Sequence, residues 1–195
     1  MVDKKAELPK IKDVVLRTIY DEEIKCKMIP LSIKATIEVE TSIELLRSKL
    51  QDKRNSKISN SISAIESEGK SLEELSDSYL EAKITNELSK LGEEITEKRV
   101  NSQKEKRREK LLEGKTRKDI INELAGIIVD TNDRKDLLFE TIVNTLYYTL
   151  RKIENLREYI FESPIDVMES LDQDALVSLF EKSDENKTTD EEIKN

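Results

Sequence analysis

The chain has 195 residues and a net charge of −8, with 39% charged, 36% hydrophobic and 4% aromatic residues. Four glycines and three prolines supply few turns, so this composition is typical of long solvated helices and predicts a mainly α fold. The absence of histidine argues against zinc or haem sites and against His-based acid–base catalysis. The overall acidity argues against a protein whose whole surface grips nucleic acid.

The single cysteine, Cys26, cannot form an intrachain disulfide. The N-terminus carries no secretory signal, and no apolar run approaches the roughly 18 to 20 residues that span a membrane. We therefore expect a soluble cytoplasmic protein, kept reduced and without membrane contact.

Residues 1–50 are predicted to form a β-hairpin followed by a helix. Two short strands, at 11–20 and 24–29, flank a charged turn, and the second alternates apolar residues with lysines, as a strand with one solvated face does. Cys26 falls on its apolar side as a small core residue. Because a lone hairpin is marginal in water, this one should pack on helices or add to the sheet of another chain.

Ser32 is the predicted N-cap of a helix that runs to about Leu50. Residues 51–70 are rich in serine and predict a linker or a weak helix that stops at Gly69. Ser71 and Glu74 then have the spacing of a capping box, which opens a long charged helix over 71–114. The apolar stripe of the first helix comprises Ile33, Ile37, Val39, Ile43, Leu46 and Leu50.

Residues 115–182 are predicted to form a C-terminal helical core. A short helix at 116–129 is broken at 130–133, and a central helix over 132–161 follows, with a wide apolar stripe. Ser163 before Pro164 and then Asp172 predict the starts of two more helices. Residues 183–195 are acidic and should be disordered. The stripe of the central helix comprises Leu138, Ile142, Leu146, Leu150, Ile153, Leu156 and Ile160.

No catalytic constellation is visible. Gly69-Lys70-Ser71 and Gly114-Lys115-Thr116 look like the end of a phosphate-binding loop, but Ala64 and Glu109 stand where that motif needs its first glycine. Helix breaks explain both glycines better. We therefore expect a non-enzymatic protein without a metal or another cofactor.

The basic run from Lys98 to Lys118 holds ten Lys or Arg against three Glu, whereas residues 154–195 hold thirteen Asp or Glu against four basic residues. The run could contact phosphates, but it lacks the interleaved aromatic residues that stack on bases. The acidic C-terminal part is the other predicted partner of the run. The residues predicted for a nucleic-acid contact are Lys104, Lys106, Arg107, Arg108 and Lys110.

Two stretches carry a resemblance to a known family. The hairpin running into Pro30-Leu31-Ser32-Ile33 and an amphipathic helix is one. The other is Phe161-Glu162-Ser163-Pro164-Ile165-Asp166-Val167, followed by the leucine-rich segment 171–181. Together they resemble tail-assembly proteins of long-tailed bacteriophages. The Ser-rich segment and charged helix, residues 51–118, depart from the compact members of that family.

The resemblance implies an assembly chaperone, or a minor tail or baseplate component, that binds tape-measure, tube or baseplate proteins in the host cytoplasm or in the virion. Helical surfaces and a hairpin edge would serve as contacts. The residues predicted to contact a partner or a second copy are Leu72, Leu75, Tyr79, Leu88 and Leu91, and packing on the chain's own central helix is the other interpretation. The alternative function is a coiled-coil regulator that associates with nucleic acid through residues 98–118.

Overall fold

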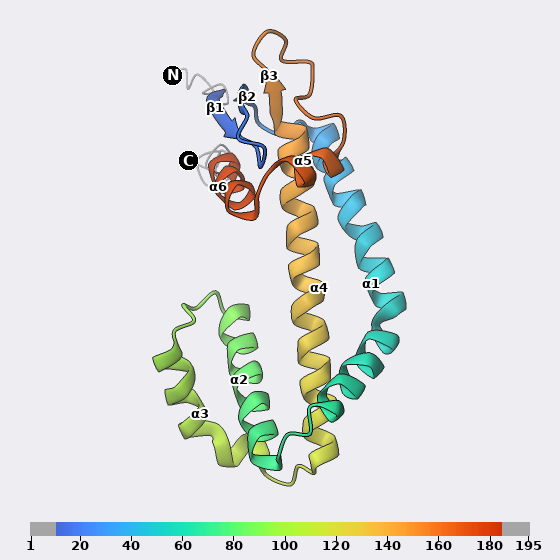
Figure 1. The fold of residues 1–195 in the computed structure, drawn as a ribbon, viewed down its shortest axis with the longest axis vertical. Helices are drawn as coiled ribbons and strands as arrows, with labels where there is room; N and C mark the ends of the chain where they lie inside the picture. The colour runs from blue at the N-terminus through green and yellow to red at the C-terminus, as the bar shows by residue number, and fades with distance from the viewer. Residues whose placement is uncertain (1–10, 185–195) are drawn as a thin grey trace, which may run out of the picture. The chain divides into compact units, whose positions relative to one another are not determined.

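The computed structural model describes residues 11–184, which contain six α-helices and a three-stranded antiparallel sheet (Figure 1). The predicted mainly α fold with an N-terminal β-hairpin is confirmed. The chain divides into two compact units, a first unit of Met1–Leu46 with Leu137–Asn195 and a second unit of Arg47–Asp136. The elements are β1 (Lys12–Arg17), β2 (Glu23–Met28), α1 (Ile33–Ser67), α2 (Leu72–Lys90), α3 (Glu97–Leu112), α4 (Arg117–Thr149), β3 (Leu150–Lys152), α5 (Pro164–Ser170) and α6 (Gln173–Asp184).

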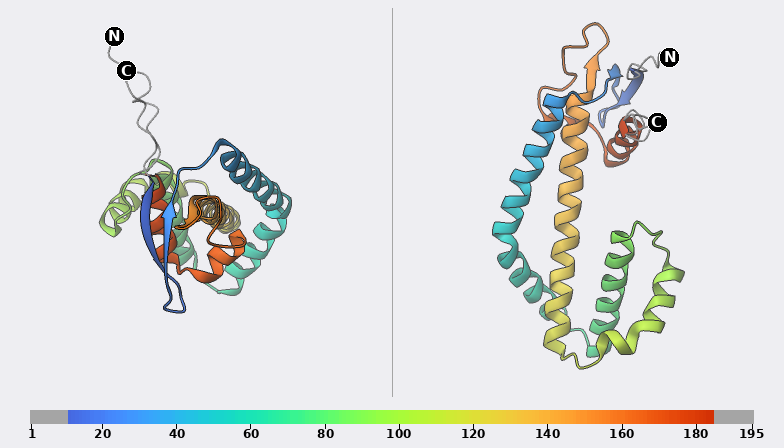
Figure 2. Two further views of the ribbon diagram at one scale, coloured as in Figure 1. Left: turned by 90° about the horizontal axis from the view of Figure 1, so that it is seen from above. Right: turned by 180° about the vertical axis from the view of Figure 1, so that it is seen from behind.

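The core of the first unit lies on one face of the sheet, whose strand order is β1-β2-β3. Inward side chains of the hairpin pack with the end of α4 and with α5 and α6, and Figure 2 shows α6 lying against the strands. Cys26 is fully buried there, as predicted, and burial raises the pKa of its thiol to about 11. The central residues of this core are Leu16, Cys26, Met28, Leu146, Leu150, Val167 and Leu176.

The second unit is entirely helical. α2 and α3 lie side by side as a helical hairpin (Figures 1 and 2). Leu75, Tyr79 and Leu80 of α2 pack against Ile120 and Leu124 of α4.

Four of the predicted signals at helix starts are confirmed. Ser71 forms the predicted capping box with Glu74, and Ser32 Oγ accepts a bond from Ala35 N at 3.2 Å. Pro164 opens α5 behind the N-cap Ser163, and Asp172 caps α6. Each of these side chains satisfies a backbone N–H that its helix leaves unpaired, which is why such residues mark helix starts.

Of the two interpretations of residues 51–70, the helix is confirmed and the linker was wrong, because α1 does not end near Leu50 but is one helix as far as Ser67. Serine lowers helix propensity only slightly, and neither Gly nor Pro interrupts the segment before Gly69. That glycine adopts a φ of +64° and ends the helix, as predicted. Tertiary contacts also stabilise this part of α1, because Ile65 is buried in the core of the second unit.

The single helix predicted over 71–114 is two helices, α2 and α3. Gly92 has a φ of +65° and donates to Ser89 O at 3.2 Å, while Glu93 N bonds Leu88 O at 3.0 Å. These bonds form a Schellman motif, which stops a helix. Thr96 then caps α3. Gly92 is a helix-stop signal in the sequence, but the apolar stripe that continues on both sides of it favoured a single helix.

The break predicted at residues 130–133 does not exist, because α4 is continuous from Arg117 to Thr149. Asp130 forms an ion pair with Arg54 of α1, and Asp133 lies 2.6 Å from Lys57 Nζ. Side-chain ion pairs thus hold these polar residues in the helix, where sequence alone indicated caps.

The predicted central helix also ends early, at Thr149 rather than near Phe161. Leu150, Arg151 and Lys152 form β3 and pair with β2, and Ile29 N donates to Thr149 O at 2.9 Å. Sheet pairing replaces the helical hydrogen bonds at this point. Of the three predicted stripe residues beyond β3, Ile153 and Leu156 are 41% and 37% exposed, whereas Ile160 packs against the core of the first unit.

The predicted disorder from Ser183 onward is incorrect at its start, because Ser183 and Asp184 belong to α6. Residues 185–195 lie outside the described part of the chain.

Candidate protein interaction site

The five residues of α2 predicted to contact a partner have different positions. Leu75, Tyr79 and Leu88 are at most 6% exposed, within the second unit's own core. These three pack on the chain's own helices, but not on the central helix predicted over 132–161: Leu75 and Tyr79 lie with residues 120–127 of α4, and Leu88 lies with Val100 of α3. Leu72 and Leu91 are 51% and 71% exposed and lie at opposite ends of the helix.

A polar network that sequence reasoning missed fixes α2 to α4. Tyr79 Oη donates to Glu123 Oε2 at 2.7 Å, and Lys115 Nζ bonds the other oxygen of that carboxylate. Burial opposes ionisation of Glu123, but the bonds from Lys115 and Tyr79 outweigh it and hold its pKa below the ordinary value. Burial and the adjacent carboxylate raise the pKa of Tyr79. The network joins three segments of the second unit.

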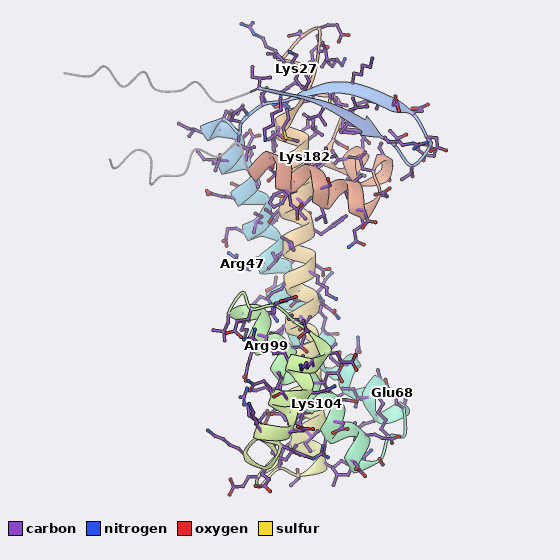
Figure 3. The ribbon with its side chains drawn as sticks, turned by 90° about the vertical axis from the view of Figure 1, so that its left-hand side faces the viewer. Lys27, Arg47, Glu68, Arg99, Lys104 and Lys182 are labelled. Atoms are coloured by element: carbon purple, nitrogen blue, oxygen red, sulfur yellow. The ribbon has the colours of Figure 1, made fainter. Side chains whose placement is uncertain are left out.

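Three of the five basic residues predicted for nucleic acid form ion pairs across the helical hairpin. Arg107 lies 2.7 Å from Glu87, Arg108 lies 2.6 Å from Asp77, and Lys104 lies 3.9 Å from Glu81. These carboxylates belong to α2, not to the acidic C-terminal part that was the predicted partner. Figure 3 labels Lys104 on α3. The remaining two residues, Lys106 and Lys110, are exposed.

The start of α1 exposes apolar side chains that the sequence assigned to the core. Ile33 and Ile37, one turn apart, are 83% and 56% exposed. Ala35 and Val39 face the interior instead. The predicted stripe is therefore buried at Val39 and Leu50 but not at Ile33 and Ile37, which remain at the surface of the first unit.

One edge of the sheet, along β1, is open. Thr18 N donates inward to Glu22 O at 2.9 Å, and Ile19 N donates outward to Ser170 O at 2.9 Å. Bond direction alternates along a strand, so every second residue of β1 directs its N–H and C=O away from β2. Within residues 11–184, no backbone group outside the hairpin bonds these outward positions before Ile19. They are Asp13, Val15 and Arg17.

The opposite edge, along β3, is covered by the chain itself. Lys152 N donates to Glu158 O at 3.1 Å, and Arg151 forms a β-bridge with Tyr159. The Tyr159 ring also stacks on Tyr147, with centroids 4.7 Å apart, and the Arg151 guanidinium lies 3.8 Å from its centroid. Among residues 11–184, the β1 edge is therefore the one left for the strand addition predicted from sequence.

A groove of about 640 Å³ lies beside the open edge, between β1 and α6. Figure 3 looks onto this side of the first unit, with Lys182 labelled on α6. Its apolar floor includes Leu16 and Leu179, while Asp174, Ser178 and Lys182 line it along the helix. No local pattern in the sequence indicated this groove, because it arises from the packing of elements far apart in the chain.

Within residues 11–184, no cluster of three or more Cys, Asp or Glu side chains is arranged to hold a metal ion. None of the helices in the same residues combines the length and apolar content of a membrane span. Comparison of the chain with protein-family models, curated proteins and solved structures gives no match.

Proposed function

We propose that the chain is a non-enzymatic assembly protein of a long-tailed bacteriophage, acting as a tail chaperone or as a minor tail or baseplate component. The proposal starts from the resemblance of the hairpin with Ser32 and of the segment from Phe161 to Glu181 to that family. Its partners would be tape-measure, tube or baseplate proteins. The function requires surfaces that bind protein rather than a catalytic group.

The observation that supports this proposal best is the exposed apolar pair Ile33 and Ile37, one turn apart at the start of α1. Large apolar side chains that share a helix surface and remain in solvent favour a protein contact. An amphipathic helix of the partner, such as a segment of a tape-measure protein, would cover them. Leu72 and Leu91 stand apart from each other and support the proposal less. The nucleic-acid alternative has less support, because α2 already neutralises Lys104, Arg107 and Arg108.

The test is affinity capture from a lysate of the native host during phage assembly, with bound proteins identified by mass spectrometry. The full chain should retain a tail tube, tape-measure or baseplate protein. The variant Ile33→Glu/Ile37→Glu should lose it, because two charges would enter the apolar contact. Ile165→Glu, at a residue that is 59% exposed on α5, is the matched control and should retain the partner.

Capture of no virion protein by the full chain would contradict the proposed function. Equal capture by Ile33→Glu/Ile37→Glu would instead reject the α1 surface as the contact. A gel shift with DNA that persists at physiological salt and disappears in Lys106→Glu/Lys110→Glu would favour the nucleic-acid alternative.

A further inference from the structure

The outward side chains of β1 have a self-complementary order. Because the side chains of a strand alternate between its two faces, Asp13, Val15 and Arg17 share the solvated face of β1, and Ile11 and Ile19 are exposed just beyond its two ends. Around Val15 this series is symmetric in character: an acidic and a basic residue lie two positions to either side, and an isoleucine lies four positions to either side. The three apolar members are between 50% and 59% exposed.

We propose that two copies of the chain pair antiparallel through their β1 edges, with Val15 on the two-fold axis. Asp13 then lies opposite Arg17 of the second copy, and Arg17 lies opposite its Asp13. These are also the positions whose backbone groups point outward, so each facing pair among the inner three exchanges two N–H···O bonds.

The local ion pairs of these residues do not oppose the contact. Arg17 lies 3.1 Å from Asp21, and Lys27 lies 3.4 Å from Asp13. Both carboxylates and the guanidinium are largely exposed. Exposed ion pairs contribute little to stability, so exchanging or sharing them with the second copy costs little.

α6, the helix beside the β1 edge, also carries an acidic and a basic residue at equal distances on either side of a central residue. Asp174, Ser178 and Lys182 are spaced four apart on α6 and line the groove. β1 and α6 run in opposite directions, because Lys12 Nζ bonds Lys182 O at one end and Ile19 N bonds Ser170 O at the other. A two-fold axis near Val15 therefore passes near Ser178.

In the dimer the two α6 helices are antiparallel across that axis. Asp174 of each copy then faces Lys182 of the other, with the small Ser178 at the crossing. Two elements distant in sequence thus carry charge orders that match under the same symmetry operation. A closed two-fold contact requires a surface complementary to itself, which favours a second copy over an unrelated strand as the occupant. This inference does not depend on the proposed function.

The first test is sedimentation equilibrium of the full chain and its charge variants. Wild type should be a dimer. Arg17→Asp places acidic residues opposite each other twice, and Asp13→Arg does the same with basic residues, so each should raise the dissociation constant tenfold or more. Asp13→Arg/Arg17→Asp restores opposite charges and should dimerise again. An equimolar mixture of the two single variants should form a heterodimer.

Circular dichroism and thermal melting establish that each variant is folded. A monomeric wild-type chain would overturn the proposal. So would a dimer that both single variants leave intact, or a double variant that is folded and still monomeric. Association only with another protein's strand, blocked by the same single variants, would reassign the edge to that protein and reject the homodimer.

A second test does not depend on the charge variants. Val15→Cys places two thiols at the axis, where facing Cα atoms of such a pair are about 5.5 Å apart, within disulfide range. Mild oxidation should give a covalent dimer on a non-reducing gel. Tyr20→Cys, at a residue that is 72% exposed on the hairpin turn, lies far from the axis and should stay monomeric. Equal cross-linking of the two variants would count against the β1 contact.

Discussion

The two units satisfy their partly buried cations in different ways. In the first unit, the guanidinium of Arg151 donates to Tyr147 O at 3.2 Å and to Leu150 O at 3.0 Å and lies over the Tyr159 ring. No carboxylate is in ion-pair distance of it among residues 11–184, and burial lowers its pKa. In the second unit, Lys115 lies against the carboxylate of Glu123.

Arg151 is thus held by carbonyl dipoles and an aromatic ring, whereas Lys115 is held by the opposite charge of Glu123. Carbonyl oxygens at a helix end carry partial negative charge at every pH, so the first arrangement does not respond to acid. A carboxylate loses its charge in acid, so the second arrangement does. Substitutions and pH should therefore separate the two units.

Arg151→Ala should have the largest effect. It removes two charge-assisted hydrogen bonds and the stacked ring contact, and we expect the free energy of unfolding in urea to fall by about 1.5–3 kcal/mol. Hydrogen exchange should rise more in the sheet than in α2 and α3. Lys152→Ala, at the exposed neighbouring position, is the control and should change stability little. An equal loss from both variants would show that the guanidinium is not held as described.

Tyr79→Phe should cost less. The ring keeps its apolar contacts with α4, and Glu123 keeps Lys115, so only the phenolic bond is lost, for about 0.5–1.5 kcal/mol. Urea unfolding measures the loss, and faster exchange in α2 than in the sheet would assign it to the second unit. Tyr20→Phe removes an exposed hydroxyl and is the matched control. If Tyr79→Phe left the free energy of unfolding unchanged, the hydroxyl bond would add nothing to stability.

Acid should weaken the second unit through Glu123. Its folded pKa is lowered, so its stabilising contribution is complete above the unfolded pKa of about 4.3 and is lost as the pH falls through the folded pKa. The difference in unfolding free energy between wild type and Glu123→Gln should thus be larger near pH 6 than near pH 3. A difference that stays constant over this range would contradict the assignment.

Arg108→Ala should have the smallest effect. Its pair with Asp77 is nearly half exposed on both sides, and such surface pairs contribute about 0.2–1 kcal/mol. The same loss should be produced by Asp77→Ala, and the double variant should lose no more than either single one. A loss above about 2 kcal/mol would mean that the pair is more shielded from solvent than its exposure indicates.

The sequence predicted the features that depend on neighbouring residues. The hairpin, the capping box at Ser71, the stop at Gly69 and the start at Pro164 each follow from a few adjacent side chains. The predictions were wrong where contacts between residues far apart in the sequence determine the local structure. Asp130 lies within α4, where it pairs with Arg54, a residue far from it in the sequence.

The candidate surfaces were predictable only in part. A hairpin edge was expected, but nothing local revealed that residues 158–159 cover the β3 edge and leave the β1 edge open. Helical spacing correctly grouped Leu75 and Tyr79, yet it could not tell a partner's surface from the chain's own α4. Ile33 and Ile37 were wrongly assigned to the core for the same reason, because periodicity identifies an apolar stripe without identifying what covers it.

The reaction rate of the Cys26 thiol measures how often the core of the first unit opens. With no exposed surface and a pKa of about 11, it is almost entirely protonated and shielded from alkylating reagents at neutral pH. Labelling by a disulfide reagent such as DTNB must therefore wait until the sheet opens. The rate of colour development then reports how often that opening occurs, with no probe attached and no residue changed.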